Sequence, residues 1–182
     1  MAVLPFDPDA LDPEDRALFE EMKAKRAAAG APFDGPYLPL MNHPQLASRI
    51  EALGYYLKFQ STLPREVYQF VVLKVARSCN VPFEWVDHVD HAREAGVPEV
   101  VIEALRTGPP ADLPEPLATA APIIDAALVW REIPDAAQQA AIKRFGRQGL
   151  VELVVLAGFY QMFSAINQGF AVPLRPGSAP PF

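Results

Sequence analysis

The sequence predicts an all-helical protein. Apolar residues recur at helical spacing along most of the chain, and the 20 prolines stand mostly where such patterns begin or end. No stretch alternates apolar and polar residues between tight turns, as a sheet would require. With 51% hydrophobic and 21% charged residues, the chain has a globular composition. We expect a single all-α domain over residues 1–182, with a helical extension at 1–30 and an extended tail at 171–182.

The first expected helix covers residues 13–29. Asp12 is placed to cap its N-terminus, acidic residues come early and basic residues late, and Gly30 follows as a stop. This charge distribution suits the helix dipole.

Prolines and glycines divide the rest of the chain into further helices. Gly96 stands where a C-terminal cap is expected, and Pro122 would kink the helix that contains it. Residues 107–116 contain four prolines and are therefore expected to form an irregular connection. The expected helices are 44–59, 64–78, 82–95, 98–106, 117–132, 135–145 and 150–170.

The most apolar segment, residues 150–163, lacks a polar face. It must therefore be covered by several helices or by a second subunit, and Gly158 would allow a helix to approach closely. Its most apolar part, 150–160, is too short to cross a bilayer and carries Glu152. The N-terminus lacks the basic start and apolar core of a secretory signal. We therefore expect a cytoplasmic protein without a membrane partner.

The distribution of charge argues against a nucleic-acid partner. The net charge is −6, and the lysines and arginines are scattered singly along the chain. A protein that binds the phosphate backbone usually gathers them on one face.

The segment FEWVDHVDHAREAG contains the best candidates for chemistry. Glu84 and His88 are four residues apart, and His91 follows three residues later, so all three are expected along one side of a helix. A carboxylate beside an imidazole can orient the ring, raise its pKa and form an acid–base pair. A solvated helix whose histidines pair with Glu84, Asp87 and Asp90 would give the same spacing. A metal site at Glu84, His88 and His91 is a weaker alternative because no second ligand cluster is evident, so we expect no metal and no cofactor.

The chain resembles the carboxymuconolactone decarboxylase and alkylhydroperoxidase D family. The likeness covers residues 64–105 and extends to 35–64 and 145–173. It is carried by the residues Glu84, Trp85, His88, Ala92, Gly96, Ile102 and Leu105. The resemblance implies an alkylhydroperoxidase D-like helical bundle that assembles as a trimer, hexamer or dimer, with a pocket for a small-molecule substrate near the subunit contacts.

The peroxidase branch of that family uses a Cys-x-x-Cys pair before its histidine. Here those two positions fall on Val81 and Glu84, and Cys79 is the only cysteine in the chain. A lone cysteine cannot form an intrachain disulfide. We expect Cys79 to be a buried structural thiol; a reactive thiol is the alternative, with Arg77 as the only nearby cation.

A glutamate stands nineteen residues before the histidine in the peroxidase branch. That position is Gln69 here, which cannot accept a proton, and Glu66 lies one turn upstream. His43 precedes Pro44 and either helps to start the helix at 44 or reaches the pocket.

The resemblance implies a decarboxylase-like lyase that acts on a small carboxylated lactone or related acid. His88 would donate the proton, Glu84 would orient it, and Arg77 or Lys74 would anchor an anionic substrate. Trp85 is expected in the core, with the pocket wall as the alternative. The candidate substrate-binding residues are Gln69, Glu66, Trp85, His43, Arg77 and Lys74.

Two other functions remain open. One is a peroxide-reducing, peroxiredoxin-like antioxidant enzyme, against which the missing cysteine pair argues. The other is a non-catalytic oligomeric protein that binds a small molecule, which Gln69 favours.

Overall fold

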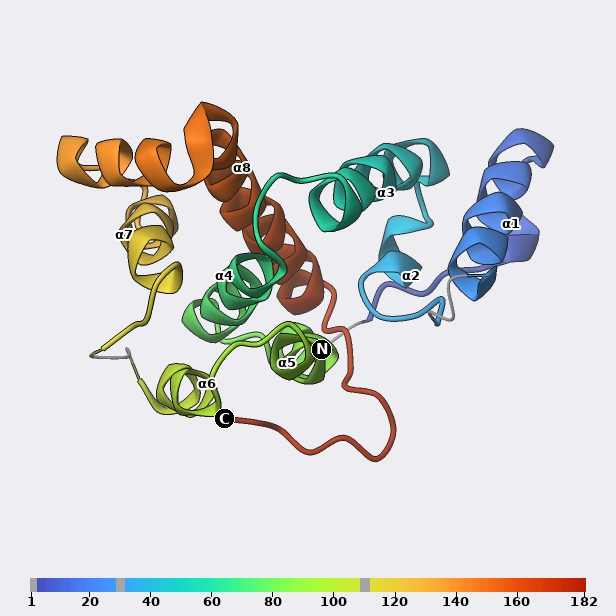
Figure 1. Ribbon diagram of the computed structural model, residues 1–182. Coiled ribbons are helices and arrows are strands. Elements are labelled where there is room, and N and C mark those ends of the chain that lie inside the picture. Colours follow the sequence, from blue (N-terminus) through green and yellow to red (C-terminus); the bar gives the residue numbers. More distant parts are fainter. Residues whose placement is uncertain (1–2, 29–31, 109–111) are drawn as a thin grey trace.

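The computed structural model describes residues 3–28, 32–108 and 112–182, and over these ranges it contains helices and no strand (Figure 1). The prediction of an all-α protein is confirmed. A 3-10 turn at Pro8–Ala10 precedes the α-helices. These are α1 (Pro13–Ala28), α2 (Tyr37–Leu40), α3 (Pro44–Phe59), α4 (Arg65–Ser78), α5 (Pro82–Glu94), α6 (Glu99–Thr107), α7 (Leu117–Leu128) and α8 (Asp135–Gly169).

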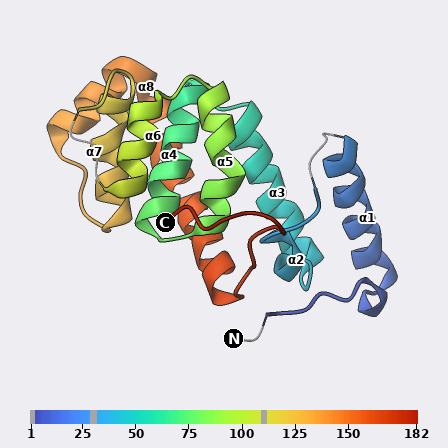
Figure 2. The same cartoon turned by 90° about the horizontal axis from the view of Figure 1, so that it is seen from below.

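Helix α4 forms the centre of the molecule. Every residue from 67 to 76 is buried, because this helix is apolar on most of its faces and must be covered from all sides. It packs against α5, α6, α7 and α8. Figure 2 shows α4, α5, α6 and α7 side by side, with α8 behind them. Side chains from α4, α5 and α8 therefore meet inside the protein.

The helix ends confirm two caps expected from the sequence. The backbone N–H of Asp15 donates to the Asp12 carboxylate at 2.9 Å, so Asp12 caps α1. After α5, Gly96 has φ +92°, and the N–H of Val97 donates to the carbonyl of Ala92 at 3.0 Å. This pattern is the Schellman motif, which glycine favours. The expected stop at Gly30, together with Ala29, lies outside the described residues.

Two boundaries differ from the sequence prediction. Helix α7 ends at Leu128 rather than at 132, because Trp130 takes φ +56° and the N–H of Arg131 turns back to the carbonyl of Ala126. A tryptophan rarely adopts that conformation, so the sequence gives no signal that the helix ends there. Helix α2 was not predicted, because a single turn is too short to show a helical period.

Helix α8 consists of two helical arms that meet at a kink at Gly146, where φ is +74° and ψ is 172°. The two helices expected at 135–145 and 150–170 are therefore the two arms of α8. In Figure 1 the orange arm lies across α7, and the red arm passes behind α4.

The N-terminal extension packs through aromatic rings. Phe6, Phe19, Phe33 and Tyr37 follow one another with ring centroids 5.1 to 6.4 Å apart, and Tyr37 is 5.7 Å from Phe163 of α8. Helix α1 otherwise lies against α3, at the edge of the molecule (Figure 1). The extension is thus attached to the core through its aromatic residues.

The chain from Val172 to Phe182 is not helical, as predicted. It runs along α5 toward α6, where the carbonyl of Pro181 accepts a hydrogen bond from Arg106 at 3.3 Å (Figure 2). The ring of Phe182 lies 5.5 Å from that of Trp85.

By length and composition alone, α8 could cross a membrane. Half of its most apolar stretch is buried inside the protein.

Candidate functional site

Six polar side chains meet in the interior between α4, α5 and α8. Each is at most 6% exposed. They are Tyr68 and Gln69 of α4, Glu84 and His88 of α5, and Tyr160 and Asn167 of α8. We call this group the His88 cluster. Buried polar groups of this kind are costly unless they are hydrogen-bonded, so their partners indicate what the cluster can do.

Hydrogen bonds hold the His88 ring from both sides. Its Nδ1 lies 2.9 Å from Oε1 of Gln69, and its Nε2 lies 3.3 Å from the hydroxyl of Tyr160. The Tyr160 hydroxyl in turn lies 2.6 Å from that of Tyr68. Because an amide oxygen only accepts, Nδ1 carries the hydrogen and Nε2 is free to accept one. The contacts form a continuous line from Tyr68 through Tyr160 and His88 to Gln69.

Burial sets the protonation of the two central groups. It lowers the pKa of His88 to about 4, although the nearby Asp87 carboxylate acts in the opposite direction. Burial also raises the pKa of Glu84 to about 7, opposed by a hydrogen bond from Asn167. At weakly acidic pH the carboxyl therefore holds a proton and the imidazole is neutral. The usual order of the two pKa values, with the carboxyl below the imidazole, is thus reversed.

The structure corrects the expected relation between Glu84 and His88. The nearest contact, from Glu84 Oε2 to His88 Nε2, is 4.0 Å, too long for a hydrogen bond. Glu84 instead accepts a 2.7 Å hydrogen bond from Asn167 Nδ2. Gln69 and Tyr160 orient the imidazole, and Glu84 stands beside it as a separate acid.

Asp87 marks the solvent side of the cluster. It is half-exposed, and its Oδ2 is 3.9 Å from Nε2 of His88. Its other oxygen pairs at 2.5 Å with Arg175, which also binds Asp34 at 2.6 and 3.0 Å. Partial burial would raise the pKa of Asp87, but His88 when protonated and the hydrogen-bonded guanidinium of Arg175 outweigh this and lower it. Asp87 is thus an anion held next to the reactive nitrogen of the imidazole.

The structure does not bring the two predicted anion anchors to the cluster. Lys74 pairs with Asp125 of α7 at 2.8 Å, and Nε of Arg77 donates to the carbonyl of Arg106 of α6 at 2.9 Å. Both side chains leave α4 on the faces that α6 and α7 cover. In this arrangement neither side chain is placed to anchor a substrate beside His88.

Three other candidates also lie apart from the His88 ring, and a fourth, His91, lies at its outer side with ring centroids 6.3 Å apart. Trp85 is buried in the core against Phe182, and His43 is exposed at the start of α3 without a capping hydrogen bond from its side chain. Glu66 lies beside Gly96, at the end of α5. His91 is exposed and pairs with Glu94 at 3.2 Å, so it belongs to the solvated face of α5.

Cys79 closes the C-terminus of α4, directly before the turn that leads into α5. The residue is half-buried rather than fully buried as expected, and it packs against the edge of the core. The Gln168 side chain donates to its carbonyl oxygen.

Side chains that could ligate a metal do not form a group of three in the described part of the chain. Asp87, the only further carboxylate near His88 Nε2, is already held by Arg175.

Two surface hollows lie elsewhere. A groove of about 380 Å³ between α3 and α8 is lined by apolar residues with Arg49 at its edge. A second, of about 290 Å³ beneath the C-terminal chain, is lined in part by Phe83 and Arg175. Neither is lined by a member of the His88 cluster.

Sequence reasoning missed Tyr68, Tyr160 and Asn167. The one signal for them was a hydrogen-bonding side chain within an otherwise apolar helix, and such a side chain needs a partner when it is buried. Gln69 was singled out by the resemblance, and the structure places it against His88.

Comparison of the chain with models of protein families, with curated proteins and with solved structures found no match. The geometry of the His88 cluster is therefore the basis for a functional proposal.

Proposed function

We propose that this protein is a lyase that removes carbon dioxide from a small carboxylated acid, with carboxylated lactones as the first class to test. In this proposal it is a homo-oligomer with the alkylhydroperoxidase D-like bundle that its sequence resembles. The supporting observation is the buried His88 ring, held between Gln69 and Tyr160 with Glu84 beside it.

Decarboxylation needs a proton donor in an apolar surround. When the carboxylate carbon leaves as carbon dioxide, the electron pair of the broken bond stays on the substrate carbon and takes up a proton. Glu84, with a pKa near 7, can supply that proton. Because Glu84 lies 4.0 Å from His88 Nε2, this transfer requires a bridging water: through it, neutral His88 takes up the proton at Nε2 and donates it to the substrate carbon, and solvent then restores the proton to Glu84. A dry site also disfavours the charge of the substrate carboxylate and so favours its loss.

A substitution of His88 tests this role. In His88→Gln we expect the turnover rate to fall by about two orders of magnitude or more, the usual share of acid–base catalysis. The first step is a screen of carboxylated lactones and short-chain oxo acids against the wild type. His91→Gln, on the exposed face of the same helix, is the matched control and should keep full activity.

Full activity in folded His88→Gln would exclude the catalytic assignment. Loss of the folded state in that variant would indicate that His88 is structural.

A non-catalytic binding protein of the same fold is the second candidate. Gln69 favours it, because its amide cannot take up the proton that a glutamate there could. Titration calorimetry would then show binding of a carboxylated lactone by the wild type without release of carbon dioxide.

A further inference from the structure

Two basic side chains stand at the outer end of the His88 cluster. The guanidinium of Arg65 lies 5.3 Å from the centre of the Tyr68 ring, and its Nη1 donates to the carbonyl of Lys58 at 2.5 Å. Tyr68 is the first member of the line of contacts that leads through Tyr160 to His88. The guanidinium of Arg65 therefore contacts the cluster directly, whereas Lys58 is joined to Arg65 through its backbone carbonyl and its ammonium lies 5.6 Å from the centre of the Phe59 ring.

Neither cation has an acidic partner. Among the described residues, Lys58 and Arg65 form no salt bridge, although acidic residues outnumber basic ones in the whole chain by 22 to 16. Burial lowers the pKa of Lys58; the Asp87 carboxylate opposes this shift, although it lies too far away for a salt bridge, and the positive charges of Arg65 and Arg26 add to it. A half-buried ammonium next to other cations is unfavourable unless an anion joins it.

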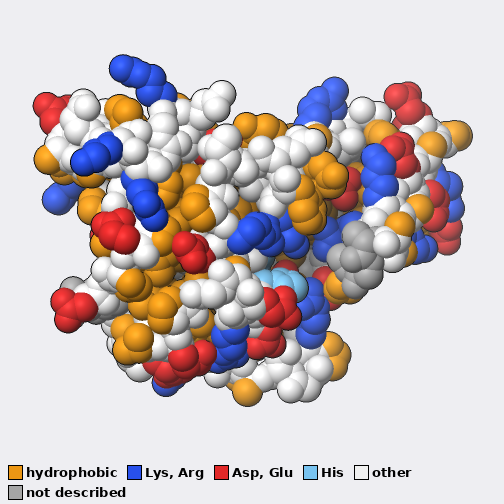
Figure 3. All heavy atoms as spheres, in the orientation of Figure 1, with side chains coloured by type: hydrophobic (Ala, Val, Ile, Leu, Met, Phe, Trp, Pro, Cys, Tyr) orange, Lys and Arg blue, Asp and Glu red, His pale blue; other side chains and the backbone are white. Residues whose placement is uncertain are grey.

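The positive charge of this pair reaches the reactive ring. Lys58 and Arg65 both disfavour the charged form of His88, while Asp87 favours it. On the face in Figure 3, basic side chains gather between α3 and α5. An anion bound to Lys58 and Arg65 would therefore also change the electrostatic environment of His88.

The cluster also has an unfilled hydrogen-bond donor. Nε2 of Gln69 is buried and has no partner among the described residues. An uncharged polar oxygen on the same ligand could accept from it, as the carbonyl of a lactone would.

We propose that Lys58 and Arg65 form the subsite that binds the carboxylate of the ligand at the outer end of the His88 cluster. The identity of the ligand as a carboxylated lactone rests on the proposed function; the anion subsite itself rests on the unpaired cations. In this proposal Lys58 and Arg65 replace Lys74 and Arg77 as the anchor of the carboxylate, because Lys74 and Arg77 contact α7 and α6 instead.

Binding of 5-oxotetrahydrofuran-3-carboxylate, a carboxylated lactone, tests the subsite without any turnover. Its Kd is measured by titration in the wild type, in Lys58→Gln and in Arg65→Gln. We expect each substitution to weaken binding about tenfold or more, the range for one lost charge-assisted hydrogen bond. The uncharged methyl ester should bind weakly to all three proteins and show no dependence on the two cations.

Arg49→Gln is the matched control. It removes one positive charge from α3, where Arg49 donates only to the carbonyl of Gln45, and it should leave the Kd within about twofold, as expected for a distant, screened surface charge. Lys58→Arg and Arg65→Lys keep the charge and should restore most of the affinity, so a general loss of folding can be distinguished from a lost contact.

Three results would overturn the subsite: no binding by the wild type, equal binding of acid and ester, or equal loss of affinity in Arg49→Gln. The result of this binding test is independent of the result of the test for lyase activity. Charge-dependent binding without turnover supports the subsite and contradicts the lyase, whereas full turnover in the double variant of Lys58 and Arg65 contradicts the subsite alone.

Discussion

At the scale of single residues, the hydrogen-bond partner of each polar side chain determines the properties of the His88 cluster. Glu84 and His88 are one turn apart, yet each finds its hydrogen bonds on another helix: Glu84 on Asn167, and His88 on Gln69 and Tyr160. Their nearest atoms are 4.0 Å apart, too far for a hydrogen bond, and they form an ion pair only if His88 is protonated. Their pKa values therefore reflect burial more than mutual attraction.

Glu84 makes stability depend on pH. Its pKa is raised from 4.5 to about 7, so between these values the folded state holds a proton that the unfolded state has lost, and stability falls as pH rises. The pKa of His88 is lowered from 6.5 to about 4, so stability falls as pH drops through that range. The two slopes have opposite signs and offset each other between pH 4.5 and 6.5.

Glu84→Gln should separate the two contributions. Above pH 7 we expect the variant to be more stable than the wild type by up to about 3 kcal/mol, since one pKa unit corresponds to about 1.4 kcal/mol. Near pH 4.5 the two proteins should be equally stable, because glutamine can still accept from Asn167. Urea unfolding at pH 5 and pH 8 measures this. Parallel stability curves for the two proteins would show that Glu84 titrates normally.

Cys79 should not support thiol peroxidase turnover. It is the only cysteine in the chain, so a sulfenic acid formed on it has no resolving thiol in the same chain. An assay with a peroxide and a dithiol reductant should show no enzyme-dependent rate. Rapid turnover that Cys79→Ser abolishes would instead support the peroxide-reducing alternative.

At the scale of elements, one glycine shapes α8. Gly146 has dihedral angles that only glycine adopts without strain, and they turn the helix so that one arm meets α7 and the other meets α4. The second arm carries Tyr160 and Asn167 to the cluster. The bend therefore decides which residues of α8 can reach His88.

Gly146→Ala should destabilise the protein by about 1 to 3 kcal/mol, the cost of placing a side chain in such a conformation. No atom lies within 4 Å of the added methyl group, so the effect comes from the backbone alone. Gly169→Ala, at the exposed C-terminal end of α8 and outside the groove, is the control and should change the stability by less than about 1 kcal/mol. Thermal unfolding measures both, and equal effects would contradict the role of the bend.

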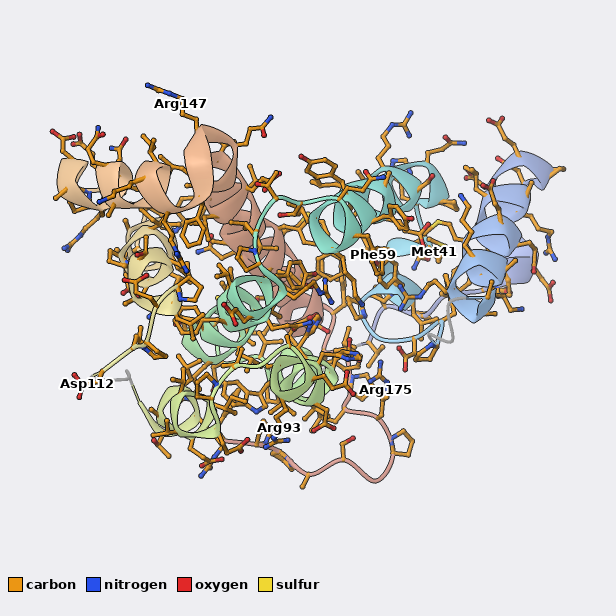
Figure 4. The ribbon with its side chains drawn as sticks, viewed as in Figure 1. Met41, Phe59, Arg93, Asp112, Arg147 and Arg175 are labelled. Atoms are coloured by element: carbon orange, nitrogen blue, oxygen red, sulfur yellow. The ribbon has the colours of Figure 1, made fainter. Side chains whose placement is uncertain are left out.

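At the scale of the whole molecule, the described residues leave apolar side chains on one surface. The groove between α3 and α8 contains Leu53, Val155 and Met162, with Val151 one turn before Val155. Figure 4 shows Phe59 at the end of α3 that faces the middle of the molecule, where its side chain is 61% exposed. Such a surface is typical of a contact between subunits.

We predict that the protein is at least a dimer at micromolar concentration. Light scattering should give a multiple of the chain mass of 19.9 kDa. Val155→Lys, in the groove, should lower the mass toward that of one chain, because a charge buried in a contact is costly. Val100→Lys, on the exposed face of α6, is the control and should leave the mass unchanged. A wild-type mass near 20 kDa would contradict the prediction.

The sequence by itself determined the helical class and most helix ends. Local signals suffice for these. Asp12 can cap only the helix that follows it, and Gly96 adopts a positive φ that other residues rarely adopt. The break near residue 146 lies where the apolar period is interrupted. It also indicated the face of α5 that carries Glu84 and His88, because a spacing of four residues fixes their relative direction on a helix.

Only the tertiary structure decided what covers that face. A helical period shows that a side chain is buried but not which helix lies against it, and the partners Gln69, Tyr160 and Asn167 come from α4 and α8. For the same reason the sequence could not show that Lys74 points to α7 whereas Lys58 stays unpaired near the cluster. Hydrogen bonds, burial and the resulting pKa values depend on contacts between residues far apart in the chain, and these form only when the helices pack.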